Sequence, residues 1–318
     1  MKKKKNTFRF LYLFIIIALV VSCATQENIK NPGDFYPGME ILRYSGSLVY
    51  VFPNEDSDKI IIILEDNQWL SVLGYWQGDT WVYTGLAAQM LQELRGTYTL
   101  LIPEKLKRMP GTYHEENMED REHYTAENVL AYYTESINSY LKNNTFSSIV
   151  LVGYSEGAML LPLVYEKLIY KDKVTTMVSV SYGGLSRYES FEILFTRSGF
   201  SEESIFYLGD ILSVFDPEKN SFPDFFDESY YYGLTQRYFT SSIHMRPYNY
   251  YKNINIPVFF IHGIEDYVIP AESTFYIQDN LPDKPFKYRY YLWGHQLEKD
   301  DDMDQLIKRI AEWIIDNS

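Results

Sequence analysis

Residues 149–157 read Ile-Val-Leu-Val-Gly-Tyr-Ser-Glu-Gly, and the rest of the fold can be worked out from this stretch. Its four leading apolar residues, three of them β-branched, predict a buried strand, and the apolar-periodic run at 158–170 predicts a helix directly after it. A glycine lies two residues to either side of Ser155, which indicates a turn too tight for side chains at its flanks. Such a turn lifts the serine hydroxyl clear of the backbone and directs the first amides of the helix at an anion beside it.

Strand and helix patterns alternate along the chain on both sides of this stretch. Strands are expected within 42–52 (one or two), 59–64, 97–102, 174–181, 256–262 and 286–292, helices at 84–94, 126–141 and 303–314, and a loop at 65–79. The alternation predicts an α/β fold with a mostly parallel central sheet and helices on both faces. Residues 185–253 break the alternation and are rich in Phe and Tyr, so we expect a cap insertion there.

Composition excludes one class of partner. The chain has 318 residues and a net charge of −14, and loss of residues 1–22, which hold five basic and no acidic side chains, would take the charge to −19. An acidic protein without a basic patch repels nucleic acid. The single cysteine, Cys23, allows neither an intramolecular disulfide nor a cysteine-based metal site, and we expect no metal ion and no cofactor.

Residues 1–22 predict a signal peptide, because four lysines after Met1 precede an apolar run at 8–21. The run ends in Val-Val-Ser-Cys23, which resembles the lipobox of bacterial lipoproteins. The resemblance implies cleavage before Cys23, lipidation of that cysteine and a place in the bacterial cell envelope; Ala24 after the cysteine favours the outer membrane. Residues 23–39 are polar, with Pro-Gly breakers, and are expected to tether a globular domain at 40–318 close to the membrane.

Three motifs make residues 40–318 resemble the α/β-hydrolase superfamily. The first is Gly153-Tyr-Ser-Glu-Gly157, and the second is His262-Gly-Ile-Glu-Asp266-Tyr-Val-Ile-Pro270, similar to the family's H-G-x-x-D-x-x-V-P acid loop. The third is Gly294-His295, between the last expected strand and the last expected helix. Their order of nucleophile, acid and histidine is that of the family. The resemblance implies an α/β-hydrolase fold and a serine hydrolase activity.

The resemblance also implies the role of each residue. Ser155 is the expected nucleophile, His295 the general base that takes its proton, and Asp266 the carboxylate that fixes the His295 tautomer. Glu265 is the alternative acid, less suited by its spacing. His262 is expected to be structural.

The oxyanion of the tetrahedral intermediate needs two preorganised amide donors. The backbone N–H of Glu156 is expected to supply one. The other is expected from the loop after the strand at 59–64, where the family often has His-Gly. Here that loop reads Glu65-Asp66-Asn67-Gln68-Trp69, without the glycine, so Asn67 is the expected donor and Asp66 the alternative. An acidic side chain in this loop would disfavour anionic substrates.

The sequence therefore predicts a membrane-tethered serine hydrolase that cleaves a carboxylic ester or related acyl bond of a small molecule through an acyl-enzyme. The Phe and Tyr content of 185–253 favours an apolar or sugar-stacking substrate over a charged one. A thioesterase, a peptidase and a carbohydrate esterase use the same triad and stay open. The alternative from another class is a non-catalytic binding protein on a hydrolase fold, suggested by the altered loop at Glu65. The sequence does not indicate an oligomeric state.

Overall fold

A computed structural model describes residues 36–44, 47–65, 72–77, 80–83, 85–104, 125–197, 236–295 and 300–318. Within these residues, eight strands form one sheet in the order β1-β2-β6-β3-β7-β8-β9-β10. The strands are β1 (Glu40–Tyr44), β2 (Ser47–Phe52), β3 (Lys59–Leu64), β6 (Thr99–Pro103), β7 (Ser148–Tyr154), β8 (Val174–Val180), β9 (Val258–Gly263) and β10 (Phe286–Tyr291). β2 runs antiparallel to both β1 and β6, and every other pair is parallel. The predicted mostly parallel sheet is confirmed.

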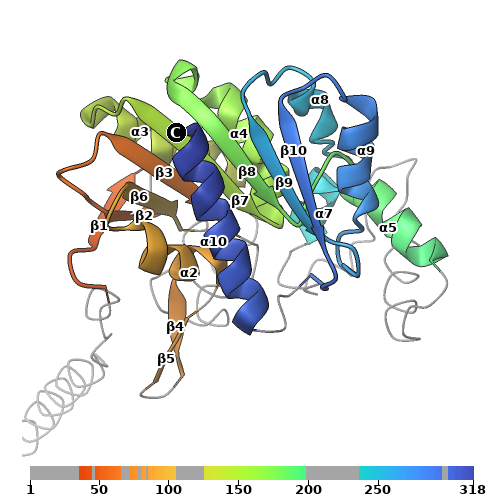
Figure 1. Cartoon of the computed structure of the whole chain (residues 1–318), viewed down its shortest axis with the longest axis horizontal. Helices are drawn as coiled ribbons and strands as arrows, with labels where there is room; N and C mark the ends of the chain where they lie inside the picture. The colour runs from red at the N-terminus through yellow and green to blue at the C-terminus, as the bar shows by residue number, and fades with distance from the viewer. Residues whose placement is uncertain are drawn as a thin grey trace, which may run out of the picture. The chain divides into compact units, whose positions relative to one another are not determined.

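Helices cover both faces of this sheet (Figure 1). One face carries α3 (Ala126–Asn143), α4 (Glu156–Lys167) and α8 (Tyr248–Tyr251), and the other carries α2 (Gly85–Leu94) and α10 (Asp300–Asn317). Every residue of β7 is buried between them. A strand buried on both faces favours apolar side chains, which is why 60–64 in β3 and 149–152 in β7 are continuous apolar runs.

The register of the parallel strands brings their carboxyl ends to one edge of the sheet. β3 and β7 pair from Lys59 opposite Ser148 to Leu64 opposite Gly153, and β8 continues the pairing as far as Tyr154. In parallel sheets this edge is the usual place for a ligand site. The residues that follow β7, β9 and β10 include Ser155, Asp266 and His295, so all three start from this edge.

The expected loop at 65–79 is wrong in its second half. The structure has a hairpin there, in which β4 (Gly74–Gln77) pairs antiparallel with β5 (Thr80–Tyr83). The sequence signal was Gly78-Asp79, a two-residue turn pair between short aromatic runs.

Several expectations fall on residues outside the described ranges. These are the signal peptide, the lipid site Cys23, the loop residues Asp66 and Asn67, and 198–235 in the middle of the expected cap insertion. The described part of that insertion contains α5 (Arg187–Thr196), α7 (Gln236–Ser242) and α8. Among the described residues, no helix combines the length and the apolar character needed to cross a bilayer.

Candidate active site

Ser155 occupies a strained turn between β7 and α4. Its backbone has φ 51° and ψ −111°, a region that side-chain-bearing residues seldom adopt and that costs about 1–3 kcal/mol. Two backbone hydrogen bonds hold it: the Ser155 N–H donates to the Val180 carbonyl at 2.9 Å, and the Ser155 carbonyl accepts from the Met159 N–H at 3.0 Å. The turn is therefore fixed by β8 on one side and by α4 on the other.

The two flanking glycines are required because backbone approaches them closely. A Cβ at Gly157 would lie 2.0 Å from the Leu64 carbonyl oxygen, and one at Gly153 would lie 2.7 Å from the Cα of Ala158. Real Cβ atoms do not come this close to backbone. The glycines thus let α4 begin directly against the end of β3, which is the steric reason anticipated from the sequence.

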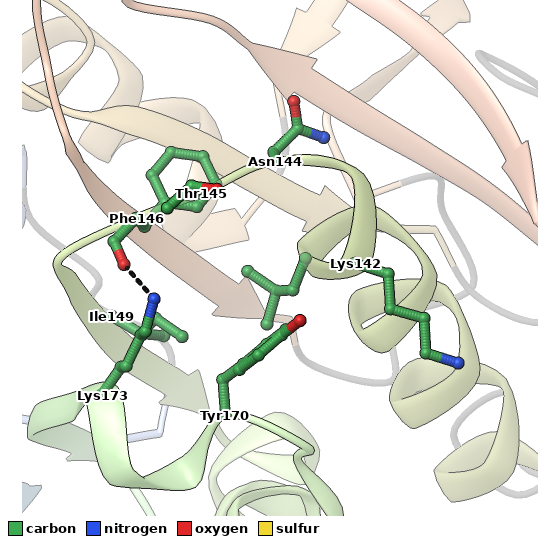
Figure 2. Close-up of a pocket in the computed structure, with 8 residues that line it drawn as sticks. Lys142, Asn144, Thr145, Phe146, Ile149, Tyr170 and Lys173 are labelled. Carbon is green, nitrogen blue, oxygen red and sulfur yellow. Dashed lines mark hydrogen bonds between the residues drawn. The ribbon is translucent and has the colours of Figure 1, made fainter.

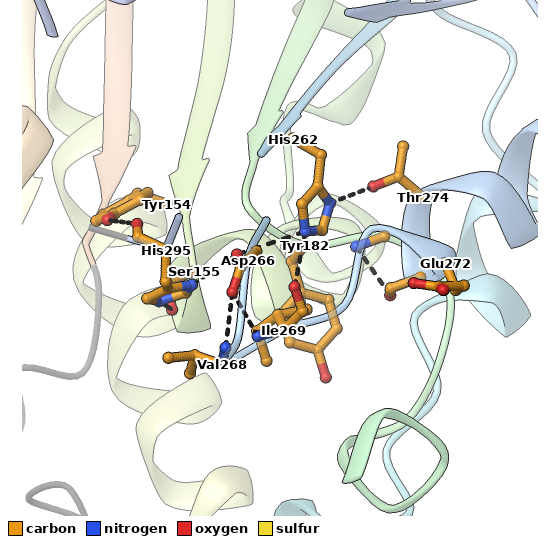
Figure 3. A network of polar contacts seen from close by, with 12 residues as sticks. Tyr154, Ser155, Tyr182, His262, Asp266, Val268, Ile269, Glu272, Thr274 and His295 are labelled. Carbon is orange, nitrogen blue, oxygen red and sulfur yellow. Dashed lines mark hydrogen bonds and ion pairs between the residues drawn. The ribbon is translucent and has the colours of Figure 1, made fainter. Parts of the chain in front are cut away.

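Ser155, His295 and Asp266 form one hydrogen-bonded chain (Figure 3). Ser155 Oγ lies 3.0 Å from His295 Nε2, and His295 Nδ1 lies 2.8 Å from Asp266 Oδ2. All three side chains are buried. These neighbours assign the proton of the neutral ring to Nδ1, where it is donated to the carboxylate, and leave Nε2 to accept the serine proton.

Asp266 is held as a carboxylate. Its Oδ1 accepts the backbone N–H groups of Val268 and Ile269, both at 2.8 Å. Burial by itself would raise the pKa of Asp266, but the positive charge of a protonated His295 and hydrogen bonds from His262 and His295 outweigh it and hold the pKa well below its ordinary value. The carboxylate therefore stays charged throughout the neutral range.

His262 has a structural role, as expected. The Thr274 hydroxyl lies 2.7 Å from His262 Nδ1. His262 Nε2 donates to the Ile269 carbonyl at 3.0 Å and lies 3.5 Å from Asp266 Oδ2. The fully buried ring thus joins the acid loop to α9 (Glu272–Asn280). Glu265, the alternative acid, has an exposed side chain, so the structure places Asp266 and not Glu265 against His295.

Backbone contacts tie the His295 loop to its neighbours. The N–H groups of Ile264 and Glu265 donate to the carbonyls of Tyr291 and Trp293 at 2.9 and 3.2 Å. The Tyr154 hydroxyl donates to the His295 carbonyl at 2.8 Å, and the two rings stack with centroids 6.0 Å apart. Tyr154 is thus a positioning residue for His295, which the sequence pattern did not identify.

The expected oxyanion donors are only partly described. Glu156 begins α4, so its backbone N–H belongs to the first turn, where amides have no partner within the helix. Asn67 and Asp66 lie outside the described residues. Glu65 before them is buried, and its carboxylate accepts the N–H of Ala87 in the first turn of α2. A helix N-terminus favours a negative charge, so Glu65 stabilises α2.

A small cavity elsewhere is too small and too distant to be the substrate site (Figure 2). It measures about 70 Å³, and its lining includes Ile149 at the start of β7, Phe146, Tyr170 and Lys173. Ser155 follows the other end of β7, about 20 Å away at the rise of a strand. Ligand pockets usually measure about 300–1,000 Å³.

The sheet, its two helical layers and the placing of Ser155, Asp266 and His295 after β7, β9 and β10 define the class: the chain has the α/β-hydrolase fold. Neither a family model nor a curated protein matches the sequence.

Among solved structures, similar ones include Est1E from Butyrivibrio proteoclasticus, with a TM-score of 0.57 and 14% identity over 88% of this chain and 98% of Est1E. The Pyrococcus furiosus esterase Pf2001 has a TM-score of 0.55 and 13% identity over 89% and 92% of the two chains. Pyrococcus horikoshii acylaminoacyl peptidase has a TM-score of 0.57 and 13% identity over 89% of this chain and 42% of the peptidase. At these identities the likeness shows the fold alone.

The close approach at Gly157 makes a testable prediction. We expect Gly157→Ala to lower the free energy of unfolding by about 3 kcal/mol, at the upper end of the cost of overpacking, because the new methyl group would press on backbone. The matched control is Gly96→Ala, where the added Cβ would have no neighbour within 4 Å and where we expect a change within about 0.5 kcal/mol. Urea unfolding of both variants measures the difference, and equal stabilities would contradict the steric account.

The lowered pKa of Asp266 makes the stability depend on pH. The folded pKa lies below the ordinary value of 3.8, so the charged carboxylate stabilises the fold above that value and this contribution is lost as pH falls toward the folded pKa. We expect Asp266→Asn to be less stable than wild type by about 2–3 kcal/mol at pH 7 and the gap to narrow below about pH 5. Denaturant unfolding at several pH values measures it. Asp279→Asn, which changes an exposed carboxylate on α9, should show the same dependence of unfolding free energy on pH as wild type. A stability difference between wild type and Asp266→Asn that stays constant with pH would contradict the lowered pKa of Asp266.

Proposed function

We propose that this protein is a serine hydrolase that cleaves a carboxylic ester or a related acyl bond through an acyl-enzyme. The observation that carries the proposal is the chain of hydrogen bonds from Ser155 Oγ through the His295 ring to Asp266 Oδ2, at 3.0 and 2.8 Å. A serine hydroxyl is a weak nucleophile until an adjacent base takes its proton, and this arrangement supplies that base.

In the first half of the reaction Ser155 Oγ attacks the acyl carbon while His295 Nε2 takes the hydroxyl proton. Asp266 keeps the ring oriented and stabilises the imidazolium that forms. The carbonyl oxygen becomes an oxyanion, and the Glu156 N–H at the start of α4 is the described group we assign to it. Asn67 is our proposal for the second donor. His295 then gives its proton to the departing alcohol oxygen, and the acyl group stays on Ser155.

In the second half a water molecule takes the place of the alcohol. His295 Nε2 accepts a proton from the water, whose oxygen attacks the acyl carbon, and collapse of the second intermediate returns the proton to Ser155. A carboxylic acid leaves. Thioester and amide bonds break by the same steps, so the bond type is decided by the pocket and not by the triad.

Removal of the nucleophile tests this proposal. We expect a fluorophosphonate probe to label the wild-type protein and not Ser155→Ala, and Ser155→Ala to lower turnover of p-nitrophenyl butyrate by about 10³-fold or more. His295→Ala should cost a similar factor, and the double variant no more than either single one, because the two residues act as a unit.

The matched control for labelling is Ser148→Ala, which alters a buried serine at the opposite end of β7. It should retain both labelling and turnover. A folded wild-type protein that the probe does not label would contradict the proposed activity and favour a non-catalytic binding protein.

We also propose that Cys23 is lipidated and anchors the enzyme to the bacterial cell envelope, with the outer membrane favoured. The support is the Val-Val-Ser-Cys23 motif at the end of the apolar run and the absence of any other cysteine from the sequence. Metabolic labelling of producing cells with an alkynyl fatty acid should mark the wild-type protein and not Cys23→Ala. Equal labelling of both proteins, or of neither, would contradict the anchor.

A further inference from the structure

Arg187, the first residue of α5, is a buried cation without a counter-ion in the described part of the chain. The residue is only 8% exposed, and its Nε has no hydrogen-bond partner there. The described ion pairs do not include it. Arginine is seldom buried unless an anion or an acceptor pairs with it, because removing the charge from water is unfavourable.

The contacts of Arg187 within the fold do not compensate for the burial of its charge. Its guanidinium carbon lies 5.6 Å from the Tyr238 ring centroid and 5.9 Å from that of Phe239, contacts that cover the flat face of the group and leave its buried Nε–H without an acceptor among the described residues. A positive charge in the first turn of α5 also opposes the helix dipole. The nearby carboxylate of Glu189 is already engaged, by Arg246 and by the N–H of Ser186, both at 2.8 Å.

Tyr182, five residues before Arg187 in the sequence, has a second buried polar group without a partner in the described ranges. It lies two residues after Val180, the residue whose carbonyl accepts the Ser155 N–H, and its buried hydroxyl has no hydrogen-bond partner among the described residues. Figure 3 shows the ring with its hydroxyl pointing away from the Asp266 network, beyond the ends of the strands.

The electrostatics of Tyr182 agree with this placement. Burial raises the pKa of its hydroxyl, against the opposing effect of Arg187 and with a smaller contribution from Glu189 and Glu156, so the group keeps its proton and is available as a donor. Tyr182 is thus within electrostatic reach of both Arg187 and the residue that follows the proposed nucleophile.

We propose that Arg187 and Tyr182 bind a carboxylate of the substrate, so that the natural substrate is an acyl compound with a free carboxylate on its acyl or alcohol part. A guanidinium edge and a phenolic O–H are matched to the two oxygens of one carboxylate. One guanidinium balances one negative charge, whereas a phosphate dianion would leave a buried charge uncompensated. The inference rests on the proposed ester-cleaving function and replaces the apolar or sugar-like substrate expected from the Phe and Tyr content.

Two substrate pairs, each with the same scissile bond, measure the preference. The first compares p-nitrophenyl hydrogen glutarate with p-nitrophenyl pentanoate, and the second compares 4-acetoxybenzoate with 4-acetoxybenzamide, all corrected for spontaneous hydrolysis. For wild type we expect the anionic member of at least one pair to have the higher kcat/KM. Arg187→Gln should lower kcat/KM for that anionic ester by about 10- to 100-fold, the size of a charge-assisted hydrogen bond, and leave its neutral partner within about threefold.

Two further variants separate binding from structure. Tyr182→Phe should lower kcat/KM for the anionic ester alone. It should leave the Tm unchanged or higher, because it removes a buried hydroxyl that has no partner in the free protein. Arg246→Gln is the matched control, since Arg246 also lies over aromatic rings but pairs with Glu189. This variant should change kcat/KM by the same factor for both members of a substrate pair.

The outcomes distinguish this inference from the proposed function. The carboxylate site is wrong if Ser155-dependent hydrolysis shows no higher kcat/KM for an anionic ester than for its neutral partner. It is also wrong if Arg187→Gln lowers kcat/KM equally for both members of a pair. In either case the proposed hydrolase activity stands. If no ester is turned over, the proposed function is wrong, and calorimetric binding of the same esters to Ser155→Ala decides about the site. Tighter binding of an anionic ester that Arg187→Gln abolishes supports the site, and equal binding overturns it.

Discussion

The close approach of α4 to the end of β3 is the constraint on which the site depends. The Leu64 carbonyl leaves no room for a side chain at Gly157, the second residue of α4, and the chain enters this helix from β7 through Ser155, whose φ is positive. Such a conformation persists only where the surroundings determine it. Here the parallel register of β3, β7 and β8 does so, because it places the Val180 carbonyl against the Ser155 N–H at 2.9 Å. The position of the hydroxyl, within hydrogen-bond distance of His295, is thus a property of the sheet.

The second half of the site depends on a buried charge. Asp266 is fully buried, which alone would favour its neutral form, yet two backbone amides and two histidines surround its oxygens. The hydrogen bonds and charges around Asp266 outweigh the effect of burial, so its pKa is lowered and the group stays a carboxylate. A neutral acid would share its own proton with His295 and no longer fix the ring with Nε2 free to accept. His262 therefore contributes indirectly, by holding the acid loop against α9 through Ile269 and Thr274.

The parts of the fold that were predictable are those encoded by local pattern. Continuous apolar runs predicted β3 and β7 because strands covered on both faces favour apolar side chains. The order of Ser155, Asp266 and His295 predicted three residues that the structure brings together. The contact from Tyr154 to the His295 carbonyl was not predictable, because it joins positions 141 residues apart and no spacing marks it. The burial of Arg187 is likewise a product of how α5 packs on α7, and in the sequence it is one charged residue at a helix start.

An acidic protein and an anionic substrate are compatible, because the two effects act over different distances. The net charge of −14 repels an anion in solution, but at physiological ionic strength that repulsion is screened over about 8 Å. A buried guanidinium acts at contact, where water and salt do not intervene and the interaction is much stronger per charge. The overall charge therefore governs how often an anionic ester arrives, and Arg187 governs how firmly it is held once inside. The Phe and Tyr content of 185–253 predicted a neutral substrate, whereas Arg187, buried and without a counter-ion among the described residues, points to a charged one.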